Sequence, residues 1–371
     1  MFEHSSVVLL AICPYARITM TEFVPELELA RRFYEDLVAP VLSSELADAP
    51  CSVALIGDGS GVLGYDTPMS RDHGWGPRLQ IVVDESIAGR APEIEGVLDE
   101  RLPESFLGYP VRFGKGGSPA RHHIEVLTVS SLLEEILGVS SIADLKPSDW
   151  LTFPQQKLLA LTSGRVFRDD TGSLGVLRNN LSYYPQDVWL YLLASGWRLL
   201  SQEMPFVGRC GDMGDELGSR TITARQCNRV MTMAFVTERR YAPYTKWFGT
   251  AFKRLKLSRG LEKPLKSALS SVDWRDRERN LAEAYRGLVA AFNDLSLLPP
   301  VPVGEEPFYD RPYIVVNGPE PELIRSLMHD NLIKALPLGV GGVDQVTDNV
   351  DVLARSTVFH RLKPFYSGLG E

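Results

Sequence analysis

The sequence predicts an α+β protein in which a small mixed sheet is followed by a helical bundle. Short apolar runs that end at glycine-rich turns, which are typical of strands, occur up to about residue 140. Segments with helical periodicity dominate the rest of the chain. Because 371 residues suit two domains better than one, we expect an α/β domain over residues 20–140 and a mainly helical domain over residues 141–371.

The first half should open with a helix, because apolar side chains recur at helical spacing over residues 25–40 and prolines stand near both ends. The apolar run over residues 52–56 then predicts a buried strand, and the glycines of residues 57–60 predict a tight turn after it. The unit is completed by a strand over 78–83, a helix around 92–101, an extended piece near 110–113, a strand over 122–128 and a helix over 129–137.

Beyond about residue 140, strand patterns nearly vanish and helices are expected instead. Their predicted ranges are 150–161, 187–202, 215–240 and 281–295. A linker over 299–307, a lone strand over 313–316 and a last helix over 320–336 complete the pattern.

Charge is divided unevenly between the two parts. Residues 1–150 hold 23 acidic and 11 basic residues, against 24 and 28 in the remainder, and the whole chain has a net charge of -8. Such an acidic protein lacks the basic surface that nucleic-acid binding requires, so we expect no nucleic-acid partner. Residues 239–266 hold nine basic residues and one acid, Glu262, and form either a solvated face or an anion-binding surface.

The four cysteines have no metal-type or paired spacing, which favours packing roles in a reducing compartment. The apolar run over residues 6–13 is too short to cross a bilayer, and no basic residue precedes it. We therefore expect a cytoplasmic protein with no membrane partner.

The most informative segment joins the turn at Gly59 and Ser60 to an acid, Asp72, ahead of the strand over 78–83. A glycine-serine turn lets the backbone approach a phosphate and offers it N–H groups and a hydroxyl. An acid on the next strand could hold the cation that bridges phosphates.

This order resembles the signature of the polymerase-beta type of nucleotidyltransferases, which includes the kanamycin and streptomycin nucleotidyltransferases. The runs GDGSGVLGYD and MSRDHGWGPR are similar to a bacterial domain family of unassigned function within that superfamily. Stretches at residues 150–157, 184–190, 206–210 and 239–249 resemble the same family. The first half is thus expected to have a nucleotidyltransferase-like fold, with a substrate cleft between the two parts.

The resemblance implies transfer of a nucleoside monophosphate from ATP or another nucleoside triphosphate to a hydroxyl of a small molecule. Gly59 and Ser60 would hold phosphates, and Asp72 and Glu125 would hold Mg2+ or Mn2+, with Glu125 as an alternative base. The superfamily carries a further acid two residues after the first, where this chain has Gly74. We expect Gly74 to share a strand with Asp72. Asp58 or Asp66 could substitute for the missing ligand, although their spacing indicates neither.

The resemblance also implies that the helical half contributes to nucleotide binding. Arg240 and Lys246 would contact phosphate, together with Arg239, while Tyr244 and Trp247 would stack on the base or pack in the bundle core.

Three alternatives stay open: a nucleotide-binding or regulatory protein that lost catalysis, a different ATP-dependent transfer or ligation on the same scaffold, and a metal hydrolase using His73, His122 and His123. The last has no zinc-type spacing to support it.

Overall fold

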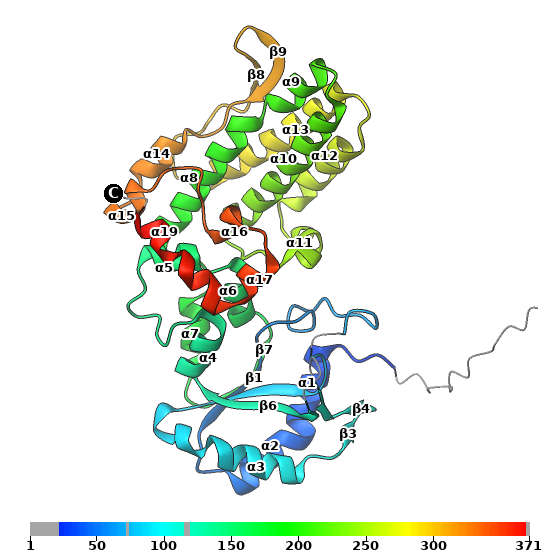
Figure 1. Ribbon diagram of the computed structural model, residues 1–371, viewed down its shortest axis with the longest axis vertical. Helices are drawn as coiled ribbons and strands as arrows, with labels where there is room; N and C mark the ends of the chain where they lie inside the picture. Colours follow the sequence, from blue (N-terminus) through cyan, green and yellow to red (C-terminus); the bar gives the residue numbers. More distant parts are fainter. Residues whose placement is uncertain (1–21, 72–73, 115–118, 369–371) are drawn as a thin grey trace, which may run out of the picture.

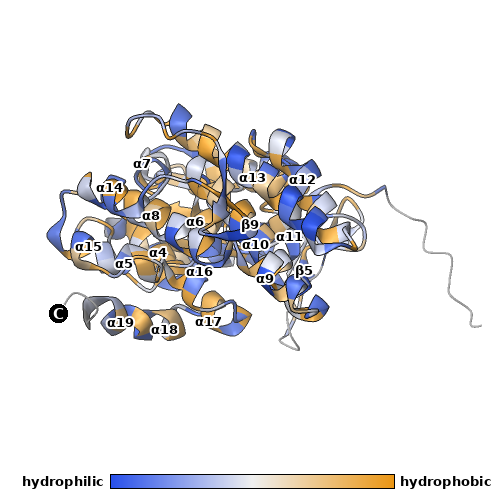
Figure 2. Ribbon diagram, turned by 90° about the horizontal axis from the view of Figure 1, so that it is seen from above, coloured by the Kyte–Doolittle hydropathy of each residue, from blue (hydrophilic) through white to orange (hydrophobic). Residues whose placement is uncertain are grey.

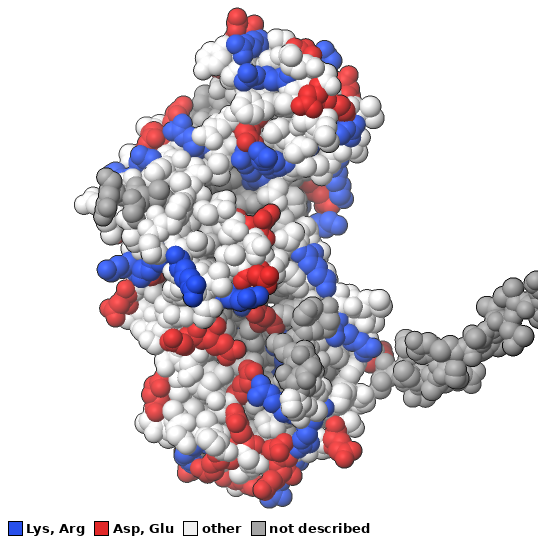
Figure 3. Space-filling model, in the orientation of Figure 1, with Lys and Arg blue, Asp and Glu red and all other residues white. Residues whose placement is uncertain are grey.

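The computed structural model describes residues 22–71, 74–114 and 119–368. A five-stranded mixed sheet with its helices occupies one end of the molecule, and helices make up most of the remainder (Figure 1). This confirms the predicted α+β class. Acidic side chains gather over the sheet part (Figure 3), as the uneven charge of the sequence predicts.

The sheet has the strand order β5-β6-β2-β1-β7. Its strands are β1 (Cys51–Leu55), β2 (Arg78–Val83), β5 (Arg112–Phe113), β6 (Arg121–Thr128) and β7 (Arg165–Asp169). β1 runs antiparallel to both β2 and β7, whereas β2 and β6 are parallel. The carboxyl end of β1 therefore meets the amino ends of β2 and β6 at one edge of the sheet.

Two expectations about strands beyond residue 140 are wrong. β7, which the sequence pattern did not indicate, pairs with β1 and brings a segment of the second half into the sheet. The strand predicted as solitary is β9 (Arg311–Val316), which forms an antiparallel hairpin with β8 (Glu305–Phe308). A further short pair is formed by β3 (Ser105–Phe106) and β4 (Tyr109–Pro110).

One face of the sheet packs on the N-terminal helices. These are α1 (Glu26–Phe33), a π-helical turn (Tyr34–Val38), α2 (Ala39–Glu45), a 3-10 turn (Glu85–Arg90) and α3 (Ala91–Arg101). Val53, Leu79, Ile81 and Ile124 point to this side and share one core with the helices. Pro40 does not end the helix as expected, because the chain continues through the π-helical turn into α2.

The other face of the sheet is covered by the helical part, because Ala54 and Val82 belong to a second core with α4 to α8. The helices are α4 (Val129–Leu137), α5 (Pro147–Thr152), α6 (Gln155–Thr162), α7 (Ser173–Asn180), α8 (Gln186–Glu203), α9 (Phe206–Asp212), α10 (Glu216–Thr237), α11 (Thr245–Phe252), α12 (Ser258–Ser270), α13 (Trp274–Asp294), α14 (Pro321–Ser326), α15 (Asn331–Ala335), α16 (Val343–Val346), α17 (Val350–Ala354), α18 (Ser356–Phe359) and α19 (Lys363–Gly368).

Two predicted helices are interrupted. The one expected over residues 150–161 breaks at Pro154 into α5 and α6, because proline disfavours the helical conformation of the residue before it. The one expected over 320–336 is divided into α14 and α15. In Figure 2, α17, α18 and α19 run along one side of the helical part.

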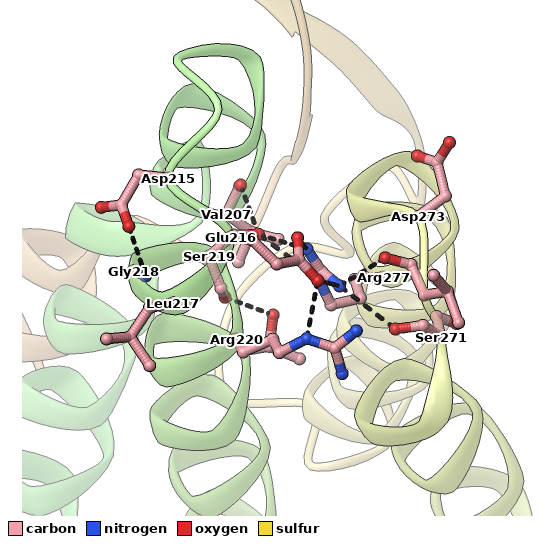
Figure 4. Close-up of polar contacts among 12 residues, drawn as sticks. Val207, Asp215, Glu216, Leu217, Gly218, Ser219, Arg220, Ser271, Asp273 and Arg277 are labelled. Atoms are coloured by element: carbon pink, nitrogen blue, oxygen red, sulfur yellow. Dashed lines mark hydrogen bonds and ion pairs between the residues drawn. The ribbon is translucent and has the colours of Figure 1, made fainter.

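A buried arginine joins the ends of three segments of the bundle (Figure 4). Arg277 in α13 is 1% exposed and forms a two-pronged ion pair with Glu216 at the start of α10. It also donates to the Ser219 hydroxyl and to the carbonyls of Ser271 and Val272. These partners leave little of its hydrogen-bonding capacity unused.

None of the helices in the described residues combines the length and the apolar character that crossing a membrane requires.

Candidate functional site

The turn after β1 lies at the edge of the sheet where β2 and β6 begin. Gly57 and Gly59 have φ angles of 105° and 133°, in the region that favours glycine. The Gly57 N–H donates to the carbonyl of Ala160 in α6 at 3.0 Å. In the described part of the chain, no acceptor takes the N–H groups of Gly59 and Ser60. The turn therefore presents free N–H groups of the kind that bind anions.

A buried ion pair supports this turn from behind. Glu26 is 1% exposed, and its Oε1 accepts from Arg78 Nε at 2.7 Å. Arg78 Nη2 in turn donates to the carbonyl of Asp58 at 2.9 Å. A Cβ on Gly59 would lie 2.9 Å from the same Nη2, and one on Gly61 would overlap the Glu26 carboxylate at 1.9 Å. The ion pair therefore depends on glycine at position 61, whereas at position 59 the backbone conformation favours glycine.

Asp66 is part of the same support rather than a free metal ligand. Its Oδ2 accepts from the Trp75 indole at 2.8 Å and from the Glu26 backbone N–H at 2.7 Å. The Gly76 N–H donates to Glu26 at 3.3 Å. Segments 57–66 and 74–78 are thus held together through α1.

The helical half contacts the turn directly through the Ser60 hydroxyl. Trp247 Nε1 donates to Ser60 Oγ at 3.0 Å, and the Tyr244 hydroxyl lies 3.2 Å from the same oxygen. Ser60 is 8% exposed. Residues separated by more than 180 positions thus meet at one oxygen, which places the glycine-serine turn beside the basic segment 239–266.

Aromatic and basic side chains surround this junction. Tyr65 stacks on Trp247, with ring centroids 5.3 Å apart. The Lys246 ammonium lies 5.0 Å from the centre of the Trp247 ring, and Lys246 is exposed. Arg254 lies over Tyr65 at 4.1 Å and donates to the Gly64 carbonyl at 3.2 Å. Two cations therefore flank the aromatic pair.

A buried lysine approaches the turn from α6. Lys157 is 6% exposed, and its Nζ donates to Asp58 Oδ2 at 2.6 Å. The Asp58 side chain is 68% exposed. Because Asp58 already neutralises Lys157, it is not a free substitute for the missing metal ligand.

Glu125 lies on the sheet face that points to the helical part. It pairs with Gln80 across the parallel strands β6 and β2, and Gln80 Nε2 donates to Glu125 Oε2 at 3.2 Å. Gln80 Oε1 accepts from the Ile56 N–H at 3.0 Å. Glu125 is therefore connected through Gln80 to the end of β1, just before the turn.

Asp72, the other predicted metal ligand, lies outside the described residues, as does His73. The expectation that Gly74 shares a strand with Asp72 is wrong, because β2 begins only at Arg78. Gly74 lies in the preceding connection with a φ of 86°. A carboxylate there would not follow the alternation of a strand.

Carboxylate oxygens are the ligands that Mg2+ prefers, but the described carboxylates do not form a metal centre. No group of three or more His, Cys, Asp or Glu that could hold a metal ion occurs within residues 22–71, 74–114 and 119–368. His123 already has partners, because its ring stacks on Phe113 and its Nε2 contacts the Phe113 carbonyl at 2.9 Å. Burial lowers the pKa of His123. The metal role of Asp72 and Glu125 stays a prediction.

The two remaining predicted residues differ in their surroundings. Arg240 is exposed and lies in the connection between α10 and α11. Its neighbour Arg239 lies over the Trp189 ring at 3.8 Å and donates to Gln186, so it packs on α8. The structure brings Gly59, Ser60 and Lys246 to one junction.

The sequence analysis missed Glu26, Arg78, Gln80, Lys157 and Arg254. Lys157 lies within a stretch already singled out by resemblance, and a lysine in an otherwise apolar helical pattern was the available signal. Nothing in the spacing of the others indicates that they meet the turn.

A family model described as a domain of unknown function (DUF4037) matches residues 150–248. The chain is also similar to a nucleotidyltransferase-like protein from Exiguobacterium sibiricum 255-15, at 10% sequence identity and a TM-score of 0.31, over 72% of this chain and 76% of that one. No curated protein matches the chain. The matched range includes Lys157, Tyr244 and Trp247, which contact the turn.

Proposed function

We propose that the chain binds a nucleoside triphosphate where the turn after β1 meets α11, and transfers its nucleoside monophosphate to a hydroxyl of a small molecule. The observation that carries this proposal is the contact of Ser60 with both Tyr244 and Trp247. It joins a turn with free N–H groups to exposed cations and an aromatic pair. Phosphate oxygens need the N–H groups and the cations, and the aromatic pair holds the two cations at the turn.

Each group has a place in this scheme. The Gly59 and Ser60 N–H groups donate to phosphate oxygens, and Lys246 adds positive charge from the other side. Arg240 belongs to the same basic connection. Lys157 holds Asp58 and so keeps the turn near α6. Glu125 accepts the proton of the acceptor hydroxyl or holds a cation, with Gln80 fixing its orientation.

A divalent cation, Mg2+ or Mn2+, is part of the proposal, with Asp72 and Glu125 as its ligands. When bound it would neutralise charge on the phosphates. Oxygen ligands suit both ions.

A second candidate is a protein that binds the nucleotide without transferring it. It is favoured by Gly74, which replaces an acid of the superfamily pattern, and by the lack of a three-ligand acidic cluster in the described ranges. Both candidates use the same turn and the same basic residues, so a binding assay tests what they share.

Isothermal titration calorimetry with ATP, GTP, CTP and UTP, each with and without Mg2+, tests nucleotide binding. We expect at least one of them to bind, more tightly with Mg2+. Lys246→Ala should weaken triphosphate binding about tenfold, since a hydrogen bond to a charged group contributes about 1.5–3 kcal/mol. The exposed Lys256 of the same segment provides the control, and Lys256→Ala should bind like the parent.

Pyrophosphate release then separates the two candidates. Release that depends on Mg2+ or Mn2+ and on an added hydroxyl compound supports transfer. Binding without release, across a panel of alcohols and sugars, supports the second candidate. If none of the four triphosphates binds under either condition, both are wrong.

A further inference from the structure

A partly open cavity of about 430 Å³ lies in the helical part, and none of the residues at the sheet edge described above lines it. Its walls come from α8 and α10, and the segment 339–348, which contains α16, closes a further side (Figure 1). The volume falls within the range of small-molecule sites. The cavity is therefore large enough for a small organic ligand.

One wall of the cavity is apolar. Leu192 and Leu199 of α8 and Met233 and Val236 of α10 contribute it. Hydrocarbon of a ligand would be removed from water along this wall, at about 25 cal/mol for each Å² buried. The wall thus suits an aliphatic chain better than a fully hydroxylated molecule.

The basic residues of the cavity already have a counter-ion. Arg225 and Arg229, both on α10, pair with Glu203 at 3.0 and 2.7 Å. Arg229 also donates to the carbonyl of Leu199 at 2.8 Å. One carboxylate shared by two guanidinium groups offsets half of their formal positive charge.

The acidic residues of the cavity have no counter-ion in the described ranges. Asp344 and Asp348 lie on the closing segment and line the cavity. Asp344 Oδ2 accepts from the Gln155 N–H at 3.1 Å, but no cationic group of the described ranges pairs with either aspartate. Burial raises the pKa of Asp344 to about 6. Asp344 is half-buried and Asp348 exposed. A partly desolvated carboxylate without a cation is unfavourable, and a ligand cation would compensate Asp344.

We propose that this cavity binds a small aliphatic amine. The ammonium group contacts Asp344, with Asp348 available to a second one, and the alkyl chain lies along Leu192, Leu199 and Met233. Glu203 lies outside the cavity lining and pairs with Arg225 and Arg229, whereas Asp344 and Asp348 pair with no cation of the described ranges, so a ligand cation compensates these aspartates. This site is independent of the nucleotide proposal and would stand if that proposal failed.

The test is calorimetry on the full chain with three probes of equal length: 1,5-diaminopentane, n-pentylamine and n-pentanol. We expect both amines to bind and the alcohol to bind at least about tenfold more weakly, because it lacks the charge-assisted contact. Equal affinity for the alcohol and the amines would overturn the proposal, as would failure of both amines to bind.

Two variants localise the binding. Asp344→Asn keeps the shape and the acceptor for Gln155, and should weaken amine binding about tenfold while pentanol binding stays unchanged. Asp351→Asn, on the exposed helix α17 outside the cavity, is the matched control and should bind like the parent. If Asp344→Asn does not fold, the exposed Asp348→Asn should reduce the affinity for the diamine more than that for the monoamine. Unchanged amine binding in the folded aspartate variants would refute the site.

Discussion

Each half of the molecule contains a buried ion pair, and the two pairs are built in opposite ways. In the sheet half the carboxylate is the buried partner: Glu26 is 1% exposed, whereas the Arg78 side chain is 15% exposed. In the helical half the guanidinium is buried: Arg277 is 1% exposed and the Glu216 side chain 49%. Arg277 binds the ends of regular helices, whereas Glu26 and Arg78 hold an irregular turn.

This difference separates stability from function. The groups around Arg277 are one serine hydroxyl and the carbonyls at helix ends. These buried acceptors need a hydrogen-bond donor, which Arg277 supplies. The groups around Glu26 and Arg78 are the backbone of the turn that we propose to bind phosphate. Breaking the first pair should therefore lower the stability of the protein without altering the site of the folded molecules, and breaking the second should damage the site more than the fold.

The largest effect is expected from Arg277→Ala. Removing this side chain leaves a serine hydroxyl and two carbonyls without their donor, so the free energy of unfolding should fall by about 3–5 kcal/mol. Urea denaturation measures the loss. Arg279→Ala, on the same helix with a side chain 66% exposed, should cost less than about 1 kcal/mol. Equal losses in the two variants would contradict the role assigned to Arg277.

A smaller loss of stability but a larger loss of binding is expected from Glu26→Gln. The amide keeps the shape and removes the charge, which should lower the free energy of unfolding by about 1.5–3 kcal/mol. Triphosphate affinity, measured on the folded protein, should fall because the turn loosens. The partly exposed Glu28 of the same helix supplies the control Glu28→Gln. Unchanged nucleotide affinity in Glu26→Gln would assign the pair a purely structural role.

A gain of stability is expected at Glu278, next to Arg277 in the chain. Glu278 is 5% exposed, one of its carboxylate oxygens has no partner in the described residues, and burial raises its pKa to about 7. Between pH 4.5 and about 7 the folded protein keeps a proton that the unfolded chain has released. Stability is therefore lost as the pH rises through this window.

Glu278→Gln should remove that loss. At pH 8 the variant should be more stable than the parent by about 1–2 kcal/mol, and at pH 4 the difference should vanish. Melting temperatures of both proteins across this range provide the check. A parent whose stability rises between pH 5 and pH 7 relative to the variant would show that Glu278 is ionised in the fold.

The smallest effect concerns the connection ahead of β2. Gly74→Asp should cost about 1 kcal/mol with or without Mg2+, because its φ of 86° is unfavourable for a side chain. Gly96→Ala, in the interior of α3 with open space around its Cα, should instead raise the melting temperature. Stability of Gly74→Asp that is restored by Mg2+ would show that a carboxylate here does join a metal site.

Local patterns in the sequence predicted most elements of the fold, since β2 and α4 have the expected limits. β7 was missed because Arg165–Asp169 mixes charged and apolar residues and lies largely half-buried beside β1. β8 was missed because its four residues include two acids and a proline. Both depend on a partner strand more than on their own residues.

The candidate site was predictable only in part. Gly59 and Ser60 follow a strand, and a tight turn is determined by residues that are neighbours in the sequence. The contact between Ser60 and Trp247 spans 187 positions, and that between Lys157 and Asp58 spans 99. Such contacts arise from tertiary packing, which no local spacing encodes. Gly74 was misplaced because the superfamily pattern puts that position on a strand, whereas the apolar run that predicts β2 begins only at Arg78.

The pairing of β7 with β1 limits where the gene for this chain can be divided by recombination. A gene fragment that ended near residue 140 would encode β1 with one side unpaired, and open strand edges of this kind promote aggregation. A fragment that began there would carry β7 with no sheet to join. The range matched by the family model contains β7 but not β1. That range would therefore be a unit of sequence descent without being a unit of folding, and recombination within this protein should preserve both strands together.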